Sequence, residues 1–148
     1  MSRRKLVYPD IDAALADIGR LRKSHTEEGQ WTLAQACFHC AWPLKLPLTA
    51  ATTATATDGQ KPYRAFIDNV NAAGVWPEQQ LPSPPMMEPP ADAGPTSIDD
   101  YVAGLQRLAA CTIPTLENQA FGPLPLDVYT KFTLIHAAHH FSHFHPTA

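Results

Sequence analysis

Residues Pro125–Phe144, PLDVYTKFTLIHAAHHFSHF, hold four of the seven histidines of the chain. In a helix, successive residues rotate by about 100°, which places all four on one face. They form two pairs spaced four residues apart, His136 with His140 and His139 with His143, and imidazoles at this spacing can bind one metal ion together. An amphipathic helix would bury this face, and buried ring nitrogens need partners. A metal ion is one such partner, while hydrogen-bonding neighbours or solvent are the alternatives.

The length and composition of the chain predict one globular domain over residues 1–148. Apolar residues make up 45% of the chain and charged residues 17%, which is typical of a protein with a buried core. The net charge is −3, so no basic field favours nucleic acid. No apolar run reaches the roughly 18 residues of a membrane span, and no apolar signal-peptide segment follows the start. We therefore expect a cytoplasmic protein that binds neither nucleic acid nor membranes.

Helical periodicity and capping residues predict three long helices before the histidine-rich one. Asp10 is the expected N-cap of the first helix. Thr32 and Gln35 form a capping-box pattern at the start of the second, and Ser97 is the candidate N-cap of the third. The expected bounds of the four helices are residues 10–22, 32–42, 97–111 and 125–144.

The middle of the chain predicts a long connection instead of a second core. Ten of the fifteen prolines lie between Pro43 and Pro95. One short helix is expected over residues 64–73, followed by an irregular crossover over residues 74–96 and, further on, a loop over residues 112–124. No convincing alternation of apolar and polar residues predicts a strand. The sequence therefore indicates an all-α four-helix bundle with a long Pro-rich crossover between helices 2 and 3.

The facing helices of a bundle bring side chains together around a core site, so the second helix is the place to look for a third imidazole. His39 lies in the otherwise apolar segment Ala36–Trp42 and is the best candidate. His25, in a polar turn, is a weaker one. Three imidazoles leave a coordination position open on a zinc-like ion, as in reactive sites. A water or a thiolate could take that position, and the metal would lower the pKa of either.

Cys37 and Cys40 form a C-x-x-C pattern, and the chain has three cysteines in all. A redox pair requires a thioredoxin-like unit around it, which the sequence does not indicate. Within a helix the two thiols are expected to act as small core residues. A structural zinc site formed by these cysteines and histidines stays a further alternative. The carboxylates are scattered, and no E-x-x-H pair, phosphate loop or nucleophile elbow is present.

Two segments of the chain resemble the DinB-like superfamily of four-helix-bundle metalloproteins. They are GQWTLAQACFHCAW, at residues 29–42, and AFGPLPLDVYTKFTLIHAAHHFSHF, at residues 120–144. The closer resemblance is to an uncharacterised branch, a domain of unknown function. In that branch a tryptophan opens the second helix, a histidine follows within it, and an F-G-x-L loop precedes H-x-x-H-H. The resemblance implies His39, His136 and His140 as the metal ligands, with zinc or nickel as the most usual metal.

The same resemblance implies what the metal does. Better-understood members of the superfamily are thiol-dependent transferases and isomerases, and many are homodimers. The implied function is therefore a metal-dependent thiol S-transferase acting on a small-molecule substrate. Two alternatives stay open. One is a metal-dependent hydrolase, in which His139 or His143 would act as acid or base. The other is a non-enzymatic, stress-associated bundle whose metal helps to hold the fold.

Overall fold

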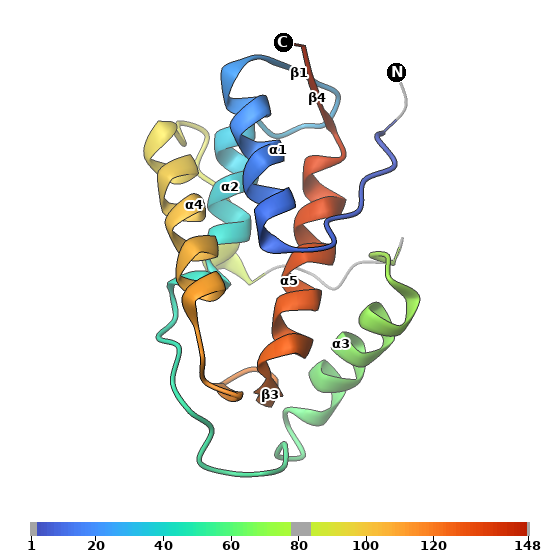
Figure 1. Ribbon diagram of the computed structural model, residues 1–148, viewed down its shortest axis with the longest axis vertical. Helices are drawn as coiled ribbons and strands as arrows, with labels where there is room; N and C mark the ends of the chain where they lie inside the picture. Colours follow the sequence, from blue (N-terminus) through green and yellow to red (C-terminus); the bar gives the residue numbers. More distant parts are fainter. Residues whose placement is uncertain (1–2, 78–83, 148) are drawn as a thin grey trace.

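The computed structural model describes residues 3–77 and 84–147, which form five α-helices and two small antiparallel sheets (Figure 1). The helices are α1 (Ile11–Lys23), α2 (Leu33–Ala41), α3 (Lys61–Ala73), α4 (Pro95–Ala110) and α5 (Leu126–Phe141). The strands are β1 (His25–Glu27), β2 (Thr115–Asn118), β3 (Gly122–Pro125) and β4 (Phe144–Pro146). Two short 3-10 helices, η1 (Pro43–Lys45) and η2 (Pro85–Met87), lie in the connections.

Helix α5, which carries the histidines, is the central element of the fold. It packs against α1, α2 and α3, while α4 packs against α1 and α2 (Figure 1). Neighbours on several sides bury residues around much of its circumference, namely Tyr129, Leu134, Ala137, Ala138 and Phe141. The four histidines therefore do not form one wholly buried face, since His136 and His140 stay partly exposed.

Local sequence signals set two of the helix starts as predicted. The Asp10 side chain accepts a hydrogen bond from the Ala13 N–H, with 2.8 Å between the two atoms. The capping box of Thr32 and Gln35 is fully formed at the start of α2. Both predictions are confirmed.

The predicted start of the third long helix is wrong. Helix α4 begins earlier, with Gly94 as the N-cap and Pro95 as the first helical residue. The Ser97 N–H already donates to the Gly94 carbonyl oxygen at 2.9 Å, so Ser97 lies inside the first turn. A proline suits this first position because its fixed φ is helical and its missing N–H would have had no helical partner.

The predicted all-α four-helix bundle is also wrong, because the described residues contain a fifth helix and two sheets. Residues expected to form a loop before α5 make the antiparallel hairpin of β2 and β3, with Asn118 opposite Gly122. The Asn118 carboxamide oxygen accepts hydrogen bonds from the N–H groups of Ala120 and Phe121. Gly122 has a φ of +81°, which a glycine adopts without strain. This turn chemistry, and not apolar alternation, creates the hairpin.

The second sheet joins two segments that lie far apart in the sequence. Strand β4, after α5, pairs with β1, after α1, and places His145 opposite Thr26. The long crossover between α2 and α4 contains α3, which begins three residues before its predicted start at Arg64. Residues 78–83 of the predicted irregular crossover lie outside the described residues.

Gly104 in α4 marks a close approach between that helix and η1. A Cβ atom placed on Gly104 would lie 2.9 Å from the Leu44 Cβ. We expect Gly104→Ala to lower the free energy of unfolding, measured by urea denaturation, by about 1–3 kcal/mol through overpacking. Gly19→Ala is the matched control, because nothing lies within 4 Å of its added Cβ, and it should raise stability by about 0.5–1 kcal/mol. Equal effects of the two substitutions would contradict the close approach.

Candidate metal centre

Three histidines from two helices meet at one point of the structure. His39 comes from α2, and His136 and His140 come from successive turns of α5. The His136 Nε2 lies 3.2 Å from the His39 Nε2 and 3.0 Å from the His140 Nε2. One ring nitrogen of each histidine lies within 4.8 Å of those of the other two. Within residues 3–77 and 84–147, no other group of three or more His, Cys, Asp or Glu side chains converges in this way.

The protons available to these rings do not suffice for the contacts they make. The His39 Nδ1 donates to the Met87 carbonyl oxygen at 3.2 Å, so a neutral His39 presents a lone pair at Nε2. A neutral His136 has at most one proton at Nε2, which cannot form full hydrogen bonds with both neighbouring Nε2 atoms. A cation satisfies all three lone pairs. Metal–nitrogen bonds of about 2.05 Å at tetrahedral angles place the nitrogens about 3.3 Å apart, close to the observed spacing.

The surroundings keep the three imidazoles neutral. Burial, together with the neighbouring His39 and His139, lowers the pKa of His136 to about 3. Burial also lowers the pKa of His140, with a contribution from His136. The pKa of His39 is lowered by burial too, although its bond to the Met87 carbonyl opposes the change. Neutral imidazole is the form that binds a metal, so the site presents its ligands in the required state.

Two tryptophans from separate parts of the chain pack against the histidines. Trp31 stacks on the His140 ring, with centroids 5.4 Å apart, and Trp76 lies 4.7 Å from the His136 ring. Rings packed in this way restrict rotation of the imidazoles, while His136 and His140 stay partly exposed. The sequence predicts these tryptophans only as packing anchors. Trp31 immediately precedes the capping box of α2, which is a local signal for its position, but no local signal indicates that Trp76 reaches α5.

The remaining histidine candidates do not join the three-histidine cluster. The His139 Nδ1 lies 3.0 Å from the Arg3 Nη2, which donates to it. His143 packs beside Gly29 at the start of α2, with its Cβ 3.4 Å from the position of an added glycine Cβ. The His25 Nδ1 is 2.6 Å from the Leu21 carbonyl oxygen and donates to it. His136 and His140 are thus the pair that meets His39.

Cys37 and Cys40 lie in the core and do not join the three-histidine cluster. Cys37 and Cys40 are both buried and free. Burial raises the pKa of the Cys37 thiol to about 12 and raises that of Cys40 as well. Protonated thiols are poor nucleophiles and poor metal ligands. Both residues act as small core side chains, which is the packing role that the sequence favours.

These residues define a helical protein with a three-histidine site between α2 and α5. The chain belongs to the family described as "Protein of unknown function (DUF1569)", whose family model matches residues 1–147. A search of curated proteins and a search of solved structures each returned no match. None of the helices in the described part of the chain combines the length and apolarity needed to cross a membrane.

Proposed function

We propose that His39, His136 and His140 bind one divalent transition metal, zinc or nickel. The convergence of three ring nitrogens, with Nε2 separations of 3.0 and 3.2 Å, is the observation that carries this proposal. The hydrogen bond from the His39 Nδ1 to the Met87 carbonyl gives it the outer support that metal-binding histidines ordinarily have. The resemblance to the DinB-like superfamily independently favours the same three residues.

We further propose that the protein is a metal-dependent thiol S-transferase. Three protein ligands would leave one coordination position of the metal open. A low-molecular-weight thiol could take this position, and the metal would lower the pKa of that thiol. In the overall reaction a carbon–sulfur bond forms while the bond from that carbon to a halide breaks. The thiol proton leaves with the halide, so the reaction needs no oxidant or reductant. The choice of a thiol rests on the superfamily resemblance, because the geometry alone would equally admit water.

The chain itself positions the three imidazoles and partly covers them. Helices α2 and α5 hold the three imidazoles on rigid elements, which fixes their relative placement better than loops would. Trp31 and Trp76 cover the His140 and His136 rings. Part of the surface of these rings is thereby shielded from solvent, which strengthens electrostatic interactions near them. The protein is also proposed to be cytoplasmic and a homodimer, and gel filtration of the purified chain tests the second point.

An activity assay tests the proposal directly. Metal-loaded protein is incubated with glutathione and other small thiols, each with 1-chloro-2,4-dinitrobenzene, and release of chloride is measured. We expect turnover that falls by more than about 100-fold in His140→Ala, because a metal ligand is lost. His143→Ala, one turn further along, should keep its activity.

The other outcomes separate the alternatives. No turnover with any thiol at full metal occupancy would contradict the transferase. Ester hydrolysis that a chelator abolishes would favour the hydrolase instead. A marked drop in melting temperature on metal removal, without any turnover, would indicate that the metal only holds the fold.

A further inference from the structure

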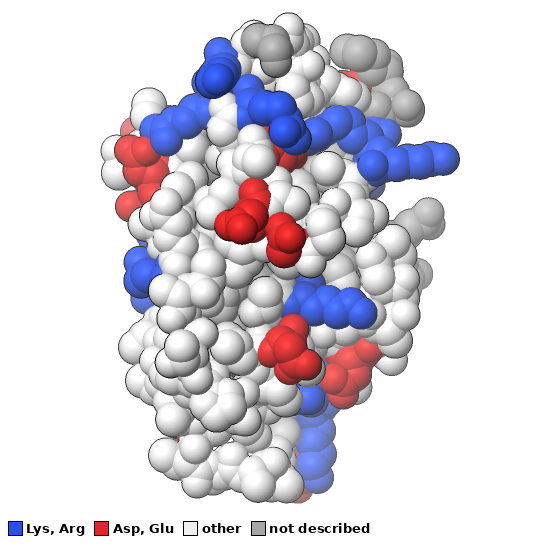
Figure 2. All heavy atoms as spheres, in the orientation of Figure 1, with Lys and Arg blue, Asp and Glu red and all other residues white. Residues whose placement is uncertain are grey.

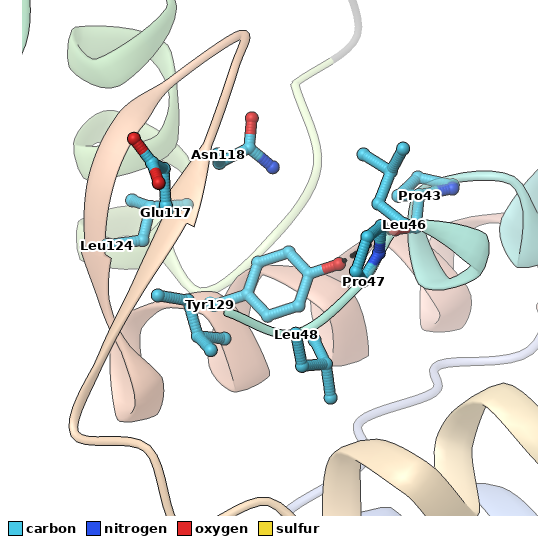
Figure 3. A pocket seen from close by; sticks show the side chains of 9 residues that line it. Pro43, Leu46, Pro47, Leu48, Glu117, Asn118, Leu124 and Tyr129 are labelled. Carbon is cyan, nitrogen blue, oxygen red and sulfur yellow. Dashed lines mark hydrogen bonds between the residues drawn. The ribbon is translucent and has the colours of Figure 1, made fainter. Parts of the chain in front are cut away.

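A second site lies beside α5, next to the three-histidine cluster but lined by none of its three histidines. It is a cavity of about 490 Å³ between the N-terminal segment, residues 3–8, the helix α5, and the turn Gly74–Pro77 that follows α3. Figure 1 shows the N-terminal segment running alongside α5, with the end of α3 next to them. The volume falls within the range of about 300–1,000 Å³ found for small-molecule pockets. The other described cavity, beside Tyr129, measures about 20 Å³ and has room for one water only (Figure 3).

The rim of the larger cavity is cationic, because Arg3, Arg4 and Lys5 all line it. Arg4 is already neutralised by a two-pronged ion pair with Asp17, at 2.9 Å for each N–O contact. Arg3 makes its hydrogen bonds to neutral acceptors, the Ser142 hydroxyl and the His139 ring and carbonyl. Among the described residues, no carboxylate forms an ion pair with Arg3 or Lys5. The two exposed cations at the rim, Arg3 and Lys5, thus have no carboxylate partner within residues 3–77 and 84–147.

Figure 2 shows Lys and Arg side chains gathered along the upper part of this face of the molecule, with Asp and Glu side chains just below them. In a chain with a net charge of −3, Arg3 and Lys5 thus give the rim of the cavity a locally positive charge. Such a field raises the local concentration of anions and attracts them to the site.

The walls of the cavity are largely apolar. Val75 and Trp76 line one side, and Leu134, Ile135 and Ala138 of α5 line the other. Val75 and Val7, which both line the cavity, have 62% and 75% of their surface exposed, so apolar surface is open to an occupant there. An apolar wall beneath a rim that carries Arg3 and Lys5 matches a ligand with an apolar body and a negatively charged head.

We propose that this cavity binds a small molecule with an apolar body and an oxyanion head, either a carboxylate or a phosphate. The head would pair with the Arg3 guanidinium and the Lys5 ammonium, and the body would lie against Trp76 and α5. Charge-assisted bonds to an oxyanion are the interaction that a guanidinium makes best. The proposal does not depend on a bound metal, because no ligand of the three-histidine cluster lines this cavity.

The two sites share a wall, which provides a signal for binding. Trp76 lines the cavity and also packs on His136, and His139 lines it while its ring lies 4.8 Å from that of His140. An occupant would therefore contact the indole of Trp76 and change its fluorescence. If the fluorescence change is lost in Trp76→Phe, it comes from Trp76 and not from Trp31 or Trp42. Calorimetry measures binding without relying on fluorescence.

The test titrates the full chain with three probes that share one apolar body: octanoate, octyl phosphate and octan-1-ol. We expect at least one of the two anions to bind about 10-fold or more tightly than the alcohol. Tighter binding of octanoate than of octyl phosphate would assign a carboxylate head, and the reverse order a phosphate. Binding of the alcohol as tight as that of both anions, or no binding of any probe, would overturn the proposal.

Variants locate the head group. Arg3→Gln should weaken binding of the preferred anion about 10-fold, whereas Arg3→Lys, which keeps the charge, should retain most of it. Lys23→Gln is the control, since it removes the same charge from an exposed position of α1 outside the cavity. Val75→Glu, at an exposed position, adds a carboxylate to the wall and should also weaken binding. Equal affinities of Arg3→Gln and Lys23→Gln would overturn the assignment of Arg3.

The same titrations are repeated on chelator-treated and on metal-loaded protein. We expect the anion to bind in both forms. Binding seen only with metal would place the anion on the metal and overturn this second site. Failure of the protein to take up any metal would contradict the proposed metal centre and leave the cavity result intact.

Discussion

Protein purified without chelators is expected to carry about one equivalent of zinc or nickel per chain, and His140→Ala to carry almost none. Removing His140 takes away one of three ligands and leaves two imidazoles, His39 and His136, that cannot hold the ion against solvent. The affinity for the metal should fall by more than about 100-fold. Removing a residue that only hydrogen-bonds to a metal ligand typically costs up to about 100-fold, and losing a ligand itself should cost more. Elemental analysis of both proteins, before and after incubation with zinc and nickel, measures this.

His143→Ala is the matched control for that comparison. It removes an imidazole from the same part of the chain, three residues further on, without touching the three-histidine cluster. We expect it to retain the full metal content. Metal lost equally from both variants would place the ligands elsewhere, and no metal in the unsubstituted protein after incubation would contradict the site altogether.

Asp17→Asn is expected to lower the free energy of unfolding by about 3 kcal/mol, because it breaks a buried ion pair at one partner. Asp17 has 1% of its surface exposed in the middle of α1. Its carboxylate accepts two hydrogen bonds from the Arg4 guanidinium, at 2.9 Å each, and one from the Tyr8 hydroxyl. The asparagine cannot neutralise Arg4 or accept all of these bonds. Urea denaturation at neutral pH measures the change.

The exposed Asp12 of the same helix provides the control. Asp12→Asn removes an equal charge from the first turn and should cost only about 0.3–1 kcal/mol, the usual contribution of an acid at a helix start. A similar loss in both variants would show that the buried pair contributes nothing beyond its charge.

The same carboxylate predicts how stability depends on pH. Burial alone would raise the pKa of Asp17, but the hydrogen bonds from Arg4 and Tyr8 and the charge of Arg4 hold it below its ordinary value of 3.8. Its contribution is therefore fully present above the unfolded pKa and is lost as the pH falls through the lower, folded value. The stability difference between wild type and Asp17→Asn should be constant above about pH 5 and shrink below pH 4. A difference independent of pH down to the acid transition would contradict this coupling.

Some features of the candidate site could be predicted from local spacing. Two histidines four residues apart in a helix lie on one face whatever surrounds them, so the His136 and His140 pair needs no tertiary information. The periodicity alone could not choose between this pair and His139 with His143. The family resemblance favours the first pair, and the structure brings the same pair to His39.

Two further features, the buried Asp17 and the hairpin, have a local signal in the sequence. Asp17 falls on the apolar stripe of α1, three residues after Ala14 and four before Leu21, and a carboxylate at such a position requires a buried partner. Which cation supplies that partner is a tertiary fact, since Arg4 reaches it from the segment before α1. Asn118 and Gly122 are likewise residues typical of a hairpin turn. The segments beside them lack the clear alternation of apolar and polar residues that usually indicates strands.

The sequence by itself determined the elements whose causes are local. Helix starts at Asp10 and Thr32 follow from side chains that cap their own backbone, and the His136 and His140 spacing follows from the helical rise and rotation. Only the tertiary structure decided the rest: the pairing of β1 with β4, the meeting of His39 with α5, and the placement of Trp31 and Trp76 over the rings. These contacts join residues far apart in the chain, and they depend on how α5 packs among α1, α2 and α3, which no short stretch of sequence specifies.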